Sequence, residues 1–133
     1  MKYFLDTNVI IDAIKGKNKN IIKHFESTFS SEIYISSIVV AELEYGAFHS
    51  SDYKRNKSLY EQFIKDFTIV PFTKECCPFY AQIRQSLTST GKIIGSNDIL
   101  IASTAIANDA VMVTHNIGEF ERIPNIKLED WTL

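Results

Sequence analysis

The feature that most constrains this chain is the alternation of short apolar runs with longer segments of helical pattern. The short runs are rich in β-branched and aromatic residues and fall at 2–5, 33–35, 68–70 and 111–113. Helices are expected over 7–15, 20–29, from the N-cap residues Ser36 and Ser37 to about 48, from about 52 to Phe67, and over 73–89 and 97–108, before a mixed tail ending at Trp131. Buried strands alternating with helices predict an α/β protein whose central parallel β-sheet is flanked by helices on both faces.

Size and composition narrow the class of protein. A chain of 133 residues predicts a single domain over residues 1–133. The start, MKYFLDTNVIID, reaches Asp6 before a signal-peptide core develops, and no stretch approaches the ~20 apolar residues of a membrane span. We therefore expect a cytoplasmic protein outside any membrane. The only cysteines, Cys76 and Cys77, are neighbours, which indicates neither a disulfide nor a zinc site.

The net charge also limits the mode of binding to any nucleic acid. The chain has 14 basic and 16 acidic side chains, a formal charge of −2. This balance excludes the strongly basic surface that is typical of proteins gripping nucleic acid non-specifically. Binding to a nucleic acid would have to be local or assisted by a metal ion.

Acidic residues near strand ends are the first candidates for a site, because function gathers at the carboxyl ends of parallel strands. Asp6 follows the first strand directly, where it could equally be the N-cap of the next helix. Glu42 lies among apolar or small residues of a predicted helix, and it could equally be a solvated surface acid. Glu44 lies about 200° further around that helix, so the two glutamates cannot serve one site.

Asp98 is the most telling acid. It is the only charge in the segment 98–107, and a helix that is apolar nearly all round is buried at the centre of a protein. A carboxylate near such a core needs a partner. The alternative role for Asp98 is to interact favourably with the helix dipole in the first turn.

The last predicted strand adds polar residues at the same expected edge of the sheet, with Thr114-His115-Asn116 and then Glu119. Several carboxylates without an obvious Lys or Arg nearby repel one another unless a cation lies between them. Oxygen ligands without His or Cys suit a hard ion such as Mg²⁺ or Mn²⁺. Such ions leave positions open for water and phosphate oxygens, which is typical of phosphodiester hydrolysis.

Four groups of residues resemble the successive motifs of VapC-type PIN domains, the ribonuclease toxins of toxin–antitoxin pairs. They are FLDTN at 4–8; ISS at 35–37 with AEL at 41–43 and YGA at 45–47; IGSNDILIA at 94–102; and VTHN at 113–116 with EFER at 119–122. They occur in order from the first strand toward Trp131, so the resemblance covers essentially the whole chain.

The resemblance implies a PIN fold and Mg²⁺- or Mn²⁺-dependent endoribonuclease activity. It also implies inhibition by a VapB-like antitoxin and a tendency to form homodimers. By motif, it assigns metal binding to Asp6, Glu42 and Asp98, with Glu119 as a fourth catalytic acid.

One position departs from the family's pattern. Many PIN domains have Asp two residues after the threonine that corresponds to Thr114, and this chain has Asn116 there. The resemblance therefore leaves open whether Asn116, Glu119 or both complete the site. Members with this variant include toxins that cut tRNA in the anticodon region, so tRNA is the expected substrate.

The expected mechanism uses the metal ion to activate a water and polarise the scissile phosphate, with in-line attack and a 5′-phosphate product. Thr7 and Thr114, beside the acids, are expected to orient a carboxylate or a water. The apolar stripes around 43–48 and 59–67 are interpreted as core, with an antitoxin-binding groove as an additional role.

Two other functions remain open from the sequence. A receiver-like phosphoacceptor domain also places acids at parallel strand ends, but it usually has paired acids and a later Lys, where this chain has Thr114-His115. The other alternative is an interaction module in which a PIN-like pocket has lost its activity. Retention of Asp6, Glu42 and Asp98 argues against that alternative.

Overall fold

A computed structural model describes residues 1–133 and contains one five-stranded sheet. The strand order is β3-β2-β1-β4-β5, and every neighbouring pair is parallel. The strands are β1 Tyr3–Leu5, β2 Ile33–Ser36, β3 Thr68–Val70, β4 Val111–Val113 and β5 Lys127–Glu129. The expected α/β architecture with a central parallel sheet is confirmed.

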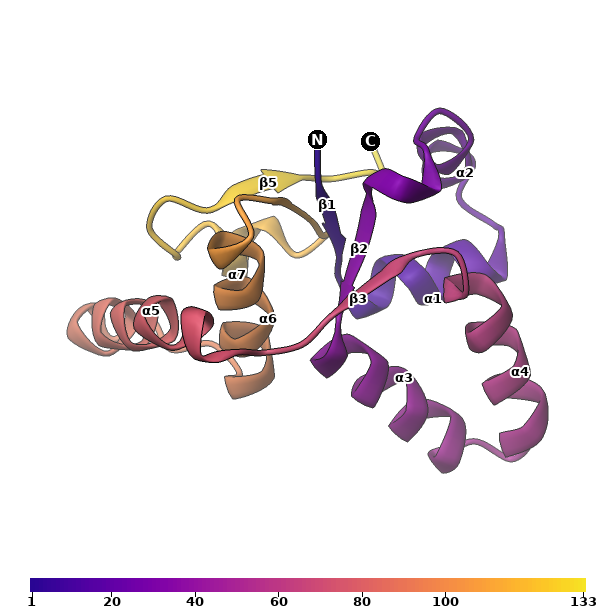
Figure 1. Cartoon of the computed structure of the whole chain (residues 1–133), viewed down its shortest axis with the longest axis horizontal. Helices are drawn as coiled ribbons and strands as arrows, with labels where there is room; N and C mark the ends of the chain where they lie inside the picture. Colours follow the sequence, from indigo (N-terminus) through magenta and orange to yellow (C-terminus); the bar gives the residue numbers. More distant parts are fainter.

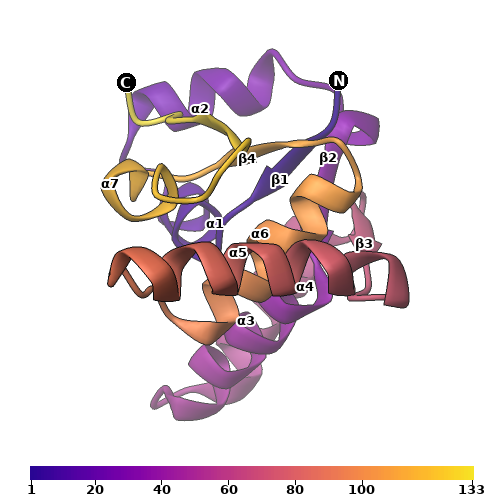
Figure 2. The same ribbon diagram turned by 90° about the vertical axis from the view of Figure 1, so that its left-hand side faces the viewer.

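Helices cover both faces of the sheet. They are α1 Thr7–Lys15, α2 Lys19–Glu26, α3 Ser37–His49, α4 Tyr53–Ile64, α5 Cys77–Thr90, α6 Ser96–Ala107 and α7 Ile117–Phe120, with short 3₁₀ turns η1 Ser30–Glu32 and η2 Lys74–Cys76. Figure 1 shows α1, α3 and α4 on one side of the sheet and α5 and α6 on the other. In Figure 2, α5 lies across the outside of α6. No helix is long and apolar enough to span a membrane.

The most buried helix is α6, as its apolar sequence predicts. Ile101, Ala102 and Ala105 are fully buried and belong to the same hydrophobic cluster as the strand residues Phe4 and Met112. Burial of a helix on all sides fixes its position, because any rotation would open cavities in a close-packed interior. The first turn of α6 is therefore held in a defined place at the edge of the core.

The sequence prediction missed one strand and misplaced the ends of several helices, among them α5, which begins at Cys77 after a 3₁₀ turn rather than at 73. The tail contains strand β5, whose Lys-Leu-Glu sequence lacks an apolar run because it is a half-exposed edge strand. Helix α2 ends at Glu26 rather than 29, where the Thr28 hydroxyl donates to the His24 carbonyl (2.6 Å). Helix α4 ends at Ile64, and Phe67 lies in the following turn. The helical spacing of Phe67 reflects packing of its ring with Phe25 and Phe63, not a continuing helix.

The strand order brings the ends of β1 and β4 together. The chain builds β1, β2 and β3 outward in one direction and then returns to place β4 on the other side of β1. Leu5 pairs with Val113, and the Asp6 amide donates to the Val113 carbonyl (2.9 Å). In open α/β sheets such a reversal of strand order is where a crevice forms at the carboxyl ends of the strands.

A single carboxylate joins α3 to α4. Glu44 accepts hydrogen bonds from the Tyr53 hydroxyl (2.8 Å), the Tyr60 hydroxyl (2.7 Å) and the Lys57 ammonium (2.6 Å). These three donors hold the pKa of Glu44 at about 2. Glu44 therefore faces α4 rather than the acids of the site, as the helical angle between Glu42 and Glu44 predicts. Its network was not predicted, although Tyr53, Lys57 and Tyr60 share one face of α4.

We expect Glu44→Ala to lower the melting temperature by several degrees, because it leaves the buried Tyr60 hydroxyl without its acceptor. Thermal unfolding monitored by circular dichroism measures the change. Glu61→Ala is the matched control, since Glu61 contacts the same Lys57 at 3.6 Å from an exposed position. Equal melting temperatures for the two variants would contradict the role given to Glu44.

Candidate active site

Asp6 is fixed at the end of β1 by two hydrogen bonds. It is the N-cap of α1, and its Oδ1 accepts from the Thr7 amide (2.8 Å). Its Oδ2 accepts from the buried Thr114 hydroxyl (2.9 Å), which comes from the end of β4. Asp6 is only 8% exposed. Asp6 can therefore cap α1 through Oδ1 and still take part in a site at the strand ends through Oδ2.

Glu42 reaches the same edge of the sheet from α3. The Ser36 hydroxyl caps that helix by accepting from the Ile38 amide (3.1 Å), so α3 starts directly at the end of β2. The Thr7 hydroxyl donates to Glu42 Oε1 (2.8 Å) and links α1 to α3. Glu42 is partly buried rather than a fully solvated surface acid.

Asp98 lies in the first turn of α6, where it meets the other acids. Burial raises its pKa to about 7, together with the charges of Asp6, Glu119 and Glu42 and a direct carboxyl contact with Glu119. A helix N-terminus alone would favour the ionised form. Burial, together with the repulsion among the acids, outweighs that effect here.

The last motif places Glu119, not Asn116, among the acids. The Asn116 side-chain amide donates to Glu119 Oε2, and the Asn116 backbone amide donates to the Thr114 hydroxyl (3.0 Å). The charge of Glu119 in turn raises the pKa values of both Asp6 and Asp98. His115 turns away from the site and contacts Asp130 (3.0 Å).

The four acids have no basic partner. None of Asp6, Glu42, Asp98 and Glu119 is among the ion pairs of the structure. Burial raises the pKa of Asp6, and the charges of Glu42 and Glu119 raise it further. Hydrogen bonds from Thr114 and Thr7 lower the pKa but do not cancel the rise. The structure thus brings the four predicted acids, Thr7, Thr114 and Asn116 into one network at the end of β1 and β4.

The donor set fits a hard divalent cation. All candidate ligands are carboxylate oxygens, and mutual repulsion raises their affinity for any positive charge placed between them. No three of them converge tightly enough to form a preformed cage. Such loose carboxylate sets match the way Mg²⁺ is held in proteins, by one or two carboxylates together with waters and phosphate oxygens.

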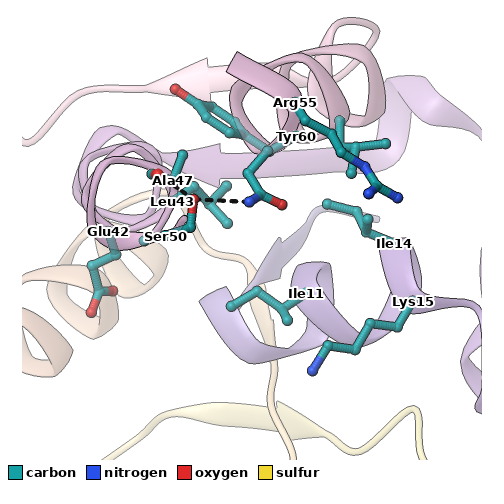
Figure 3. Close-up of a pocket in the computed structure, with 12 residues that line it drawn as sticks. Ile11, Ile14, Lys15, Glu42, Leu43, Ala47, Ser50, Arg55 and Tyr60 are labelled. Atoms are coloured by element: carbon teal, nitrogen blue, oxygen red, sulfur yellow. Dashed lines mark hydrogen bonds between the residues drawn. The ribbon is translucent and has the colours of Figure 1, made fainter. Parts of the chain in front are cut away.

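An apolar groove begins beside Glu42 (Figure 3). It has a volume of about 650 Å³ and lies between α1, α3 and α4, with Ile11, Ile14 and Leu59 among its lining residues. Lys15 and Arg55 add positive charge. The Glu42 carboxylate lies at one end of the groove and points away from its interior. Of the predicted stripes, Leu43 and Ala47 are buried, whereas Leu59 is partly exposed in the groove.

The PIN-domain family model matches residues 3–126 of the chain. Ribonuclease VapC2 from Rickettsia felis is 43% identical over 132 residues, which cover 98% of each protein. The tRNA(fMet)-specific endonuclease VapC from Salmonella typhimurium is 39% identical over 98% of each.

The chain belongs to the VapC branch of the PIN-domain family.

Solved structures agree with this assignment. The VapBC2 complex from Rickettsia felis, bound to a promoter DNA fragment, matches with a TM-score of 0.91 at 41% identity, covering 98% of this chain and 99% of that one. DNA-bound VapBC from Salmonella typhimurium matches with a TM-score of 0.92 at 39% identity, covering 98% of each. The expectation of a PIN-fold nuclease is confirmed, and the receiver-like alternative is wrong.

In metal-free buffer we expect the free energy of unfolding to fall as the pH rises from about 4 to about 7. The folded protein holds the Asp98 proton up to a pH of about 7, whereas the unfolded chain loses it near 3.8, so the folded state binds more protons between these values. Asp98→Asn should therefore raise the melting temperature at pH 8 and reduce its pH dependence.

Asp109→Asn is the matched control for this titration. Asp109 is exposed, has a φ of 50° that Asn tolerates, and its pKa is lowered by the ion pair with Lys127 (2.8 Å). It should not raise the melting temperature at pH 8. A wild-type stability that stayed constant between pH 4 and 8 would show that the acids do not interact as described.

Proposed function

We propose that this protein is the toxin of a toxin–antitoxin pair and acts as a metal-dependent endoribonuclease. The observation that supports this most is the loose cluster of four carboxylates, without a basic partner, where the strand order reverses. Family membership supplies the ribonuclease class, since the relatives are named ribonucleases. An interaction module that had lost its activity would have no need to keep an arrangement that costs stability.

In the proposed site, Asp6, Glu42 and Asp98 would hold Mg²⁺ or Mn²⁺, and Glu119 would act as the fourth acid. The bound ion would lower the pKa of a water and polarise the scissile phosphate. Attack of the water oxygen on phosphorus would break the bond between phosphorus and the 3′ oxygen. The water would lose a proton and the 3′ oxygen would gain one, which leaves a 3′-hydroxyl and a 5′-phosphate.

The neutral residues of the site position the acids. The Thr114 hydroxyl orients Asp6, the Thr7 hydroxyl orients Glu42, and the Asn116 amide orients Glu119. Because hydroxyl and amide donors carry no charge, they fix the carboxylates without cancelling the charge that attracts a cation. Asn116 thus supports Glu119 instead of replacing it.

We propose tRNA as the substrate. The support is the 39% identity over nearly the whole chain to the enzyme named a tRNA(fMet)-specific endonuclease. A tRNA substrate is consistent with a cytoplasmic protein. We also propose that the chain forms homodimers, as the family resemblance implies.

We further propose a VapB-like antitoxin as the partner of the apolar groove beside Glu42. The solved relatives are complexes named VapBC. The groove has the apolar floor that an amphipathic helix needs, and Lys15 and Arg55 favour an acidic segment. A partner seated there would lie next to Glu42, which lines one end of the groove.

We expect purified protein to cut total tRNA in the presence of Mg²⁺ and to lose this activity in EDTA. Asp98→Asn should lower the cleavage rate by at least about a hundredfold. Thr114→Val, which releases Asp6 and the Asn116 backbone amide but removes no acid, should lower it by about 10- to 100-fold. Gel analysis and mapping of the new 5′ ends measure both rates. Full activity of Asp98→Asn, with an intact circular dichroism spectrum, would exclude Asp98 from the catalytic set.

Leu59→Glu should abolish co-purification with the product of the neighbouring antitoxin-like reading frame, because it places a charge in the apolar groove. Cleavage of tRNA should be unchanged. Ile69→Glu is the control, since Ile69 is equally exposed (43%) but lies on strand β3, outside the groove. If both variants still retain the partner, the antitoxin binds elsewhere.

A further inference from the structure

Tyr45 is a large aromatic residue with no role in holding the fold together. Its side chain is 67% exposed, and it lies on α3 one turn after Glu42. Residues three apart on a helix are neighbours on its surface, so the ring of Tyr45 is close to a catalytic acid of the proposed site. The two side chains line the same depression.

This depression is distinct from the apolar groove. It has a volume of about 430 Å³ and is lined by Thr7, Ala41, Glu42, Tyr45 and Asn97. Glu42 is the only residue that also lines the groove. The depression therefore lies on the other side of Glu42, between the start of α1, the middle of α3 and the start of α6.

The ring of Tyr45 is held in place by a second ring. His49, one turn further along α3, stacks on it with a centroid distance of 5.6 Å and an angle of 14° between the planes. The exposed fraction of Tyr45 shows that much of its ring remains open to solvent. A flat ring supported on one side and open on the other is the arrangement on which unpaired nucleobases stack.

The charge of the protein explains why RNA binding would need a stacking surface. The protein has a net charge of −2, and no Lys or Arg lines the depression to bind the phosphates of an RNA strand. Contacts to phosphates cannot then supply most of the affinity, as they do for basic RNA-binding proteins. Stacking of a base is independent of the phosphate charge and tolerates every base, since each has a π-face.

We propose that Tyr45, supported by His49, binds an unpaired nucleobase of the RNA next to the scissile phosphate. This inference rests on the proposed ribonuclease function. It makes Tyr45 a substrate-binding residue rather than a residue of the chemical step. It also favours single-stranded regions such as loops, because a base in a duplex would first have to be unpaired and unstacked to reach the ring.

The binding test uses the Asp98→Asn protein, which should not cut, and a 15-nucleotide single-stranded RNA with 2-aminopurine at its centre. We expect the fluorescence of the 2-aminopurine to be quenched on binding, because quenching reports stacking. Tyr45→Ala should weaken binding about tenfold and remove the quenching, whereas Tyr45→Phe should preserve both. The same RNA in a duplex should bind weakly to all variants.

Phe48→Ala is the matched control. Phe48 lies on the same helix and is similarly exposed (76%), but its ring packs on Tyr53 and does not line the depression. It should leave binding unchanged.

In the active protein, Tyr45→Ala should raise KM for RNA about tenfold with little change in kcat, since it removes binding and not chemistry.

Three results would overturn the proposal. The first is RNA binding by Tyr45→Ala that equals the parent. The second is equal weakening by Phe48→Ala, which would indicate a general effect on α3. The third is a change in oligomeric mass caused by Tyr45→Ala in light scattering, which would show that a second copy covers this ring. Absence of RNA cleavage by the unmodified protein would instead refute the ribonuclease function itself.

Discussion

The repulsion among Asp6, Glu42, Asp98 and Glu119 is the interaction on which the proposed function of this fold depends. Burial and the neighbouring like charges both disfavour ionisation of Asp98, and its pKa of about 7 reflects this conflict between charge and environment. The conflict persists because the surrounding structure fixes each acid separately. Asp6 is tied to β4, Glu42 to α1, and Asp98 to the most buried helix of the protein.

The kind of donor that holds each acid in place matters as much as the closeness of the acids to one another. The chain orients its acids with hydroxyl and amide donors and places its ammonium groups elsewhere. Glu44 shows the contrast: it lies two residues from Glu42 but accepts from Lys57, and its pKa falls to about 2. One helix thus presents a neutralised structural carboxylate on one face and an unneutralised one on another. A cation that binds beside Glu42 would reduce the repulsion among the acids, and its binding would therefore also stabilise the folded state.

Local pattern was enough to predict the architecture, and the family resemblance named the acids that the fold brings together, but neither gave the contacts between them. The all-apolar segment after Asp98 predicted a central helix, and buried strands predicted a parallel sheet. Strand β5 was missed because an edge strand is held by backbone hydrogen bonds and does not need apolar side chains. The sequence of Lys127–Glu129 therefore lacks the apolar pattern that predicts a strand. The choice between Asn116 and Glu119, and the Glu44 network, depend on which side chains meet after folding, and no spacing in the sequence encodes those contacts.

Glu42 also lies where two surfaces of different chemistry meet. The apolar groove begins on one side of it and the depression with Tyr45 on the other. On the proposed function, an antitoxin helix and an RNA strand would approach one carboxylate from opposite sides. The partner would then not need to fill the whole substrate path to stop cleavage. Displacing or neutralising Glu42 alone would remove one of the charges that raise the pKa of Asp98. It would also remove part of the affinity of the site for a divalent ion.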